Sequence, residues 1–169
     1  LESMGFEVRL SKVQDLGRTF LSKGLLDTAL ETAETVVEGL APFAQKNYPI
    51  IGLEPSEILT IRDEYLDLVP DAQLQAAKTL ASKTYTFEEF VALHKDRFPT
   101  TRLNPISKAP KVVLHGHCHT KALIGNTATI KALELAGYDV EAMDTGCCGM
   151  AGSFAVSYTH LRAHETRPN

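Results

Sequence analysis

Apolar residues recur at spacings of three and four between residues 19 and 41, which predicts an amphipathic helix over that range. Pro42 follows this pattern as a break. Residues 49–53 form a short apolar run that is typical of a buried strand. Pro55 suits the first turn of a helix, because its missing N–H is not needed there, and we expect that helix to run to Leu68.

The middle of the chain predicts two more helices and a linker. Residues 71–82 have a helical pattern. Thr86 and Glu89 then form a capping-box pattern, which opens a helix that we expect to reach about Phe98. Residues 99–110 hold three prolines and no apolar period, so we expect a loop or linker there.

The remaining pattern alternates strand, helix and strand. Residues 111–115 predict a strand, residues 116–119 a turn, the next segment a helix to about Ala136, and residues 138–143 another strand. This alternation indicates an α/β fold with parallel strands. Ligands of such sheets bind beyond the carboxyl ends of the strands, and both cysteine-containing segments of the chain follow predicted strands.

Part of the sequence repeats at a constant offset of 132 residues. Five of eight positions are similar, pairing Leu1-Glu2, Gly5-Phe6 and Val8 with Leu133-Glu134, Gly137-Tyr138 and Val140. The same offset places Asp15 and Leu16 at the positions of Cys147 and Cys148. We therefore predict two pseudo-repeated Rossmann-like halves, with short parallel sheets flanked by helices and truncated at both ends. The first half has lost its cysteine pair.

These patterns divide the chain into three segments. Residues 1–108 form the first, degenerate half, which lacks its cysteine pair and its opening strand. Residues 109–155 form the second, incomplete half. Residues 156–169 have no apolar period, and the run from Ser157 to Thr166 resembles translated adapter sequence at the ends of truncated metagenomic reading frames. We expect this tail to be foreign to the protein.

Composition narrows the choice of partners and compartment. The 169 residues carry 21 acidic and 17 basic side chains, so no basic excess indicates nucleic-acid binding. No apolar run approaches the ~20 residues that a membrane-spanning helix needs. Three cysteines are a poor fit to a disulfide-stapled secreted domain. We expect reduced thiols and a cytoplasmic location, with peripheral attachment at the inner face of the membrane as an alternative.

The strongest chemical signal is the set of three cysteines, in which 28 residues separate Cys118 from the adjacent pair Cys147 and Cys148. Thiolates are soft ligands that suit zinc, copper(I) or iron–sulfur clusters. Gly146 and Gly149 flank the pair and let the backbone approach a cluster closely and aim N–H groups at sulfur. The same thiols fit a metal-free redox site or three buried structural residues.

Three histidines alternate with other residues around Cys118. If the segment is extended, His115, His117 and His119 point the same way. Alternating histidines bind zinc in some proteins, and in others they hydrogen-bond to a metal ligand and orient it. Both roles, and simple exposure at the end of the strand, are compatible with the pattern.

The cysteine segments resemble a known family. The run from His115 to His119, followed by residues 147–154 with the sequence Cys-Cys-Gly-Met-Ala-Gly-Ser-Phe, is similar to the cysteine-rich CCG domain. This domain occurs in iron–sulfur components of glycolate oxidase and anaerobic glycerol-3-phosphate dehydrogenase, in lactate-utilisation proteins and in heterodisulfide reductases. The resemblance covers residues 1–155 and is greatest to the C-terminal part of long bacterial FAD-linked oxidases.

The resemblance implies an iron–sulfur electron-transfer domain, with a [4Fe–4S] cluster held by Cys118, Cys147 and Cys148. It also implies partner domains in the same full-length chain: a flavin domain with FAD that oxidises glycolate, D-lactate or D-2-hydroxyglutarate, and a ferredoxin-like domain. The electron acceptor is not implied. Each repeat of the family usually has an early cysteine, a pair and a later cysteine, and Glu57 stands where relatives often have cysteine. We expect the fragment alone not to be catalytic, and a structural zinc module remains the alternative.

Overall fold

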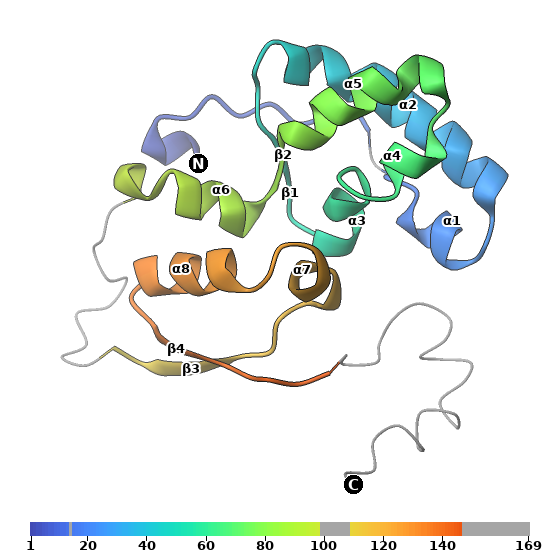
Figure 1. The fold of residues 1–169 in the computed structure, drawn as a ribbon. Helices are drawn as coiled ribbons and strands as arrows, with labels where there is room; N and C mark the ends of the chain where they lie inside the picture. The colour runs from blue at the N-terminus through green and yellow to red at the C-terminus, as the bar shows by residue number, and fades with distance from the viewer. Residues whose placement is uncertain (14, 99–108, 147–169) are drawn as a thin grey trace, which may run out of the picture.

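The computed structural model of the protein describes three stretches of the chain: residues 1–13, 15–98 and 109–146. Two short parallel sheets lie in them. Strand β1 (Ile50–Gly52) pairs with β2 (Thr84–Thr86), and β3 (Lys111–Leu114) pairs with β4 (Asp139–Ala142). Helices pack around the first sheet and cover one side of the second (Figure 1). The α/β class and the parallel pairing predicted from the sequence are therefore confirmed.

The hydrophobic core lies around the first sheet. Helix α2 (Leu26–Gln45) packs along α5 (Asp71–Ser82), and α3 (Pro55–Thr60) and α4 (Tyr65–Leu68) close the core from the side. The buried cluster is Ala33, Val36, Val37, Leu40, Ala41, Ala44, Ile58, Leu59, Ile61, Tyr65, Val69, Ala77 and Leu80. The apolar periodicity of α2 therefore reports the face that is removed from water.

The long helix predicted over residues 19–41 is divided in two. Helix α1 (Arg18–Ser22) ends because Gly24 adopts a left-handed conformation with φ of 71°, and its N–H donates to the carbonyl of Leu21 at 3.0 Å. Helix α2 then continues through Pro42, which was expected to be a break. A proline near the end of a helix removes one hydrogen bond without ending it when the buried face compensates.

The predicted helix from Pro55 to Leu68 is also divided, into α3 and α4. Residues 71–82 form α5 as predicted. The capping box is confirmed, because Glu89 N–H donates to Thr86 Oγ1 at 3.2 Å and Thr86 N–H donates to Glu89. The helix that it opens, α6 (Phe87–Leu93), ends earlier than expected, and a short 3₁₀ turn follows over Lys95–Arg97.

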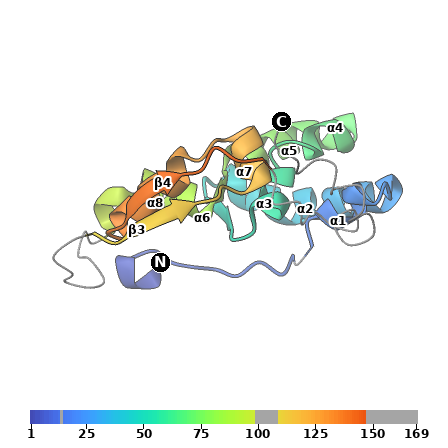
Figure 2. The same ribbon diagram turned by 90° about the horizontal axis from the view of Figure 1, so that it is seen from below.

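Residues 109–146 form a thin layer that rests on the rest of the molecule. Helix α7 (Cys118–Leu123) packs against α3, and α8 (Thr127–Leu135) packs against α6. Figure 2 shows β3 and β4 on the outer side of these helices. Within residues 109–146 no hydrophobic side chain is fully buried, and Val113 is 63% exposed. This layer therefore depends for its stability on its contacts with α3 and α6.

The two copies of the sequence repeat share one local geometry. Gly5 and Gly137 both have positive φ angles, 82° and 93°. In each copy the glycine N–H donates to the carbonyl three residues back, and the next N–H donates to the carbonyl five residues back. The segments that follow differ: residues 139–142 form β4, whereas residues 6–12 form no strand among the described residues. The division into two Rossmann-like halves stays a prediction.

Candidate functional site

The carboxyl ends of β3 and β4 meet at one edge of their sheet. The N–H of Met143 donates to the carbonyl of Leu114 at 2.9 Å and extends the ladder beyond β4. Further along, Thr145 Oγ1 lies 2.8 Å from His115 Nδ1. The segment that leads to Cys118 therefore lies beside the segment that leads to Cys147.

Lys121 strengthens this connection from helix α7. Its ammonium donates to the carbonyl of Thr145 at 2.7 Å and to the carbonyl of Gly146 at 3.0 Å. Lys121 is three positions after Cys118, so the two residues lie on the same face of α7. The last described residues before the cysteine pair are thus held against the helix that begins with Cys118.

Cys118 is the first residue of α7, and its side chain is half-buried. The sequence analysis placed this residue in a turn, but the helix begins at that turn with His117 as its N-cap. The rings of His117 and His119 are stacked, with centroids 5.7 Å apart, whereas His115 contacts the loop after β4. The alternating histidines therefore separate into a stacked pair and a loop contact.

A carboxylate from the other sheet reaches the stacked histidines. Glu54 is the N-cap of α3, and its Oε2 accepts hydrogen bonds from the Glu57 N–H and the Ser56 hydroxyl, both at 2.6 Å. Its Oε1 lies 3.6 Å from Nε2 of His117. Burial works to raise the pKa of Glu54, but these hydrogen bonds and the charge of His117 outweigh it, so the pKa lies below its ordinary value.

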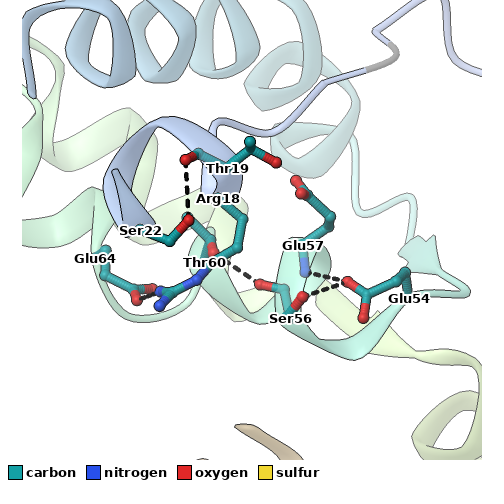
Figure 3. A network of polar contacts seen from close by, with 8 residues as sticks. All are labelled: Arg18, Thr19, Ser22, Glu54, Ser56, Glu57, Thr60 and Glu64. Atoms are coloured by element: carbon teal, nitrogen blue, oxygen red, sulfur yellow. Dashed lines mark hydrogen bonds and ion pairs between the residues drawn. The ribbon is translucent and has the colours of Figure 1, made fainter. Parts of the chain in front are cut away.

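Glu57 points from α3 to the loop that precedes α1 (Figure 3). Burial and the nearby charge of Asp15 raise the pKa of Glu57, although the backbone amides of Leu16 and Arg18 act in the opposite direction. Two positions that the sequence analysis singled out as replaced cysteines therefore meet: Glu57 and the Asp15-Leu16 pair. The predicted repeat implies that these positions correspond to cysteines in related sequences, and this correspondence stays a prediction.

Arg18 completes the contacts around α3. It forms an ion pair with Glu64, and both side chains are half-buried (Figure 3). Burial, followed by the positive charge of Arg18, lowers the pKa of His119, which favours a neutral imidazole at neutral pH. Arg62 pairs with Glu89 at 2.7 Å. The Arg18–Glu64 pair connects α1 to the start of α4, and the Arg62–Glu89 pair connects the segment after α3 to α6.

The described residues contain part of the predicted ligand set. Cys118, His115, His117, His119 and Gly146 are placed as above. Cys147, Cys148 and Gly149 lie outside the described residues, and the cluster of thiolates stays a prediction. Within residues 1–13, 15–98 and 109–146, no group of three or more His, Cys, Asp and Glu side chains has the geometry to hold a metal ion.

A pocket of about 320 Å³ lies beside β1. Its lining is mostly apolar, with side chains from β1 and α3 such as Ile51 and Ile58, and it includes the carboxylates Glu54 and Glu57. No lysine or arginine of the described residues lines it. Its electrostatics therefore disfavour a carboxylate ligand.

Sequence reasoning did not identify Lys121. The turn Glu54-Pro55-Ser56 lies at a predicted strand end and could face the same crevice as the cysteines, but the sequence does not name His117 as the residue that Glu54 contacts. Lys121 could have been found from its spacing, because a residue three positions after Cys118 on the predicted helix shares its face. Pro55 marks the start of α3, but glutamate is not a preferred N-cap residue, so the capping role of Glu54 was not predictable from its residue type. Its proximity to His117 needed the packing of α3 against α7 and is not encoded in either local pattern.

Comparisons with known proteins agree on one class of enzyme. No known protein family and no solved structure matches the chain. The D-2-hydroxyglutarate dehydrogenase of Escherichia coli K12 is 28% identical over 156 residues, and that of Pantoea ananatis is 26% identical over 156 residues. The D-2-hydroxyglutarate dehydrogenase of Haemophilus influenzae is 25% identical over 162 residues.

These matches cover 90–91% of this chain but only 14–15% of each relative. The chain is therefore similar to a small part of much larger dehydrogenases, as the resemblance to long oxidases led us to expect.

The described helices offer no segment with the length and apolar character to cross a membrane.

Proposed function

We propose that this chain is an iron–sulfur electron-transfer region of a FAD-linked dehydrogenase that oxidises a 2-hydroxy acid. One observation carries the proposal. Lys121 holds Thr145 and Gly146, which directly precede Cys147, against the helix that begins with Cys118. The described residues that lead to Cys147 therefore meet the start of α7 at the carboxyl edge of one parallel sheet, where ligands of α/β folds bind.

The donor set suits the proposed cofactor. Three thiolates are typical iron–sulfur ligands, and one-electron transfer is the chemistry that such a cluster supplies when bound. Cys118, Cys147 and Cys148 are the proposed ligands. At Gly146 an added Cβ meets no described atom within 4 Å. We propose that glycine at positions 146 and 149 lets backbone N–H groups approach the cluster.

The relatives support the choice of reaction. They are D-2-hydroxyglutarate dehydrogenases, and we extend that substrate class to the full-length protein from which this chain comes. We propose that the substrate binds in another domain of that protein, because the pocket beside β1 carries Glu54 and Glu57 and disfavours an anionic acid. The resemblance places FAD in the flavin domain. In this proposal residues 1–108 are the degenerate repeat, residues 109–155 hold the cysteines and residues 156–169 are foreign. We propose a cytoplasmic location for the protein.

The test is iron, zinc and acid-labile sulfide analysis of the full chain after anaerobic purification, with an absorption spectrum. Iron and sulfide in equal amounts, with a visible band that bleaches on reduction, are the expected result. The variants Cys118→Ser, Cys147→Ser and Cys148→Ser are each expected to lose the iron. A protein with sulfide-free zinc, or with no metal after anaerobic reconstitution, contradicts the proposal.

A structural zinc site is the second candidate, and the stacked pair of His117 and His119 favours it. The two rings flank Cys118, and zinc commonly binds mixed sets of cysteine and histidine. This candidate predicts zinc without sulfide and no visible band. The double variant with His117→Ala and His119→Ala separates the two: it loses zinc if a histidine is a ligand, and it retains iron if the cysteines suffice.

A further inference from the structure

Strand β1 has one edge that no described strand covers. The N–H of Ile50 donates to the carbonyl of Lys83 at 2.8 Å, on the side of β2. Successive residues of a strand direct their N–H and C=O groups to opposite edges, so those of Ile51 face away from β2. Among the described residues, β2 is the sole strand that pairs with β1. At the outer edge of β2 the N–H of Thr86 is already taken by Glu89, at 3.0 Å. The edge that can accept a further strand is therefore that of β1.

The pocket beside β1 follows this edge. It is lined by residues 50–53 on one side and by Ser11 and Val13 of the N-terminal segment on another. The same two segments carry the two most exposed large apolar side chains of the described residues: Leu10 is 93% exposed and Leu53 is 81% exposed. Exposed apolar side chains beside a strand edge without a partner strand are typical of a site that binds another polypeptide segment.

One end of the pocket holds a hydrogen-bond acceptor without a donor. Glu57 lines the pocket next to Glu54, just beyond the carboxyl end of β1. Its Oε2 atom is buried and has no hydrogen-bond partner among the described residues. Because a buried acceptor without a donor is unfavourable, a ligand that brings an N–H group to this end is favoured. A strand parallel to β1 ends here and supplies the N–H groups of the turn that follows it.

The predicted repeat indicates which kind of strand fits. In the second sheet β4 pairs in parallel with β3, the strand before it in the sequence. The repeat matches β4 with residues 7–10, so the counterpart of β3 lies before Leu1 in the repeat. Residues 7–10 form no strand and are exposed, as expected for a segment without its neighbouring strand.

We propose that the pocket beside β1 binds one further strand, parallel to β1 and apolar like β3, from the segment of the longer protein that precedes Leu1. The strand pairs with the backbone of Ile51, lies between β1 and residues 7–10, and covers Leu53 and Leu10 with apolar side chains. This inference uses the longer protein of the proposed function, but it needs no metal site.

The test uses the 169-residue chain and a labelled synthetic peptide with the sequence of residues 110–115, which contains β3. Fluorescence anisotropy measures the binding. Ile51→Pro removes the N–H that faces the pocket and is expected to weaken binding by at least about tenfold.

Val113→Pro is the matched control. The carbonyl of Leu114 accepts from Met143 on the β4 side, so the N–H of Val113 faces the outer edge of β3. The control therefore also removes one outward N–H from a two-stranded parallel sheet, and its affinity for the peptide is expected to equal that of the parent. Thermal unfolding by circular dichroism checks that both variants fold.

A second measurement needs no variant of the protein. The peptide is expected to slow hydrogen exchange of the Ile51 amide at least about tenfold and to leave the Val113 amide unchanged. In β3 the residue at position 113 faces away from β4, so N-methylation of the peptide at that position is expected to abolish the protection. N-methylation at position 112 is expected to retain it.

The remaining outcomes overturn the inference. Equal binding by the parent and Ile51→Pro, or by the two methylated peptides, means that an apolar ligand enters the pocket without strand pairing. Protection of Ile51 that rises with protein concentration in the absence of peptide means that a second copy of the chain fills the pocket. A chain without iron that passes the peptide tests fails the proposed function alone, and a chain with iron whose Ile51 amide stays unprotected fails this inference alone.

Discussion

Nε2 of His117 lies 3.6 Å from Oε1 of Glu54, and this contact joins the start of α7 to the start of α3. Both residues are helix N-caps that follow a strand of their own sheet. The strand–helix unit of each sheet therefore contacts the other unit at the turn between its strand and its helix. The side chains are 41% and 53% exposed, so solvent screens the attraction and it contributes little stability by itself.

Glu54→Ala is expected to destabilise the protein by about 1 kcal/mol, mainly because the first turn of α3 loses its cap. The pKa of Glu54 is lowered in the folded protein, so its contribution is present above the ordinary value of 4.5 and is lost as the pH falls through the folded pKa. Urea unfolding at several pH values measures both effects. Glu31→Ala, an exposed site on α2, is the control. Equal losses for the two variants contradict the capping role.

Glu57 is expected to have the opposite effect to Glu54 on how stability changes with pH. Its pKa is raised by burial and by Asp15, so the folded protein binds a proton at a pH where the unfolded chain has released it. Stability from this group is complete below 4.5 and is lost as the pH rises through the folded pKa. We expect Glu57→Gln to reduce the gain in stability seen when the pH falls from 7 toward 4.5. An unchanged pH profile of urea unfolding shows that the interpretation is wrong.

Local sequence patterns predicted much of the first sheet and its helices. The period of α2, the strand at residues 50–52 and the capping box at Thr86 all follow from short-range chemistry, and the structure confirms them. The positions at which helices end were predicted less well. Gly24 ended a helix that the apolar pattern continued, and Pro42 did not end one, because tertiary burial of α2 outweighed the loss of one hydrogen bond.

The candidate site was less predictable because its contacts cross between segments. The sequence identified Cys118 and the histidines, but it could not show that Glu54 reaches His117 or that Arg18 pairs with Glu64. Residues 62–64 form a charge run, a pattern that is usually a solvated face, yet Arg62 and Glu64 each pair with a residue far away in the sequence. Charge runs do not reveal their partners when those come from other elements.

Two glycines allow close approach between a strand end and a helix: Gly52 at the end of β1 approaches α3, and Gly116 after β3 approaches Asn126, the N-cap of α8. A Cβ at Gly52 lies 2.3 Å from Cβ of Ile58, and a Cβ at Gly116 lies 2.2 Å from Oδ1 of Asn126. We expect Gly52→Ala and Gly116→Ala each to destabilise the protein by about 1–3 kcal/mol through overpacking.

A double-mutant cycle identifies the cause. Asn126→Ala removes the atoms that oppose the new methyl group at position 116. The double variant is therefore expected to be more stable than the sum of the single effects predicts. Additive losses in chemical denaturation mean that Gly116 matters for its backbone conformation and not for the close contact with Asn126.

The hydroxyl of Tyr65 ties the core to the loop near the candidate site. Tyr65 is fully buried, and its hydroxyl donates to the carbonyl of Leu16 at 2.9 Å. Burial, with the charges of Glu57 and Asp15, raises its pKa, so the phenol keeps its proton and remains a donor. The loop that contacts Glu57 is therefore held by the core as well as by α3.

Tyr65→Phe is expected to lower the free energy of unfolding by about 1 kcal/mol, since the part-buried carbonyl of Leu16 loses its donor while the ring still fills the core. Tyr85→Phe is the matched control, because among the described residues the Tyr85 hydroxyl has no hydrogen-bond partner and its ring is half-buried on β2. Urea unfolding of both variants at pH 7 measures the difference. If Tyr65→Phe is as stable as Tyr85→Phe, the hydrogen bond does not anchor the loop, and the position of Leu16 is set by side-chain packing alone.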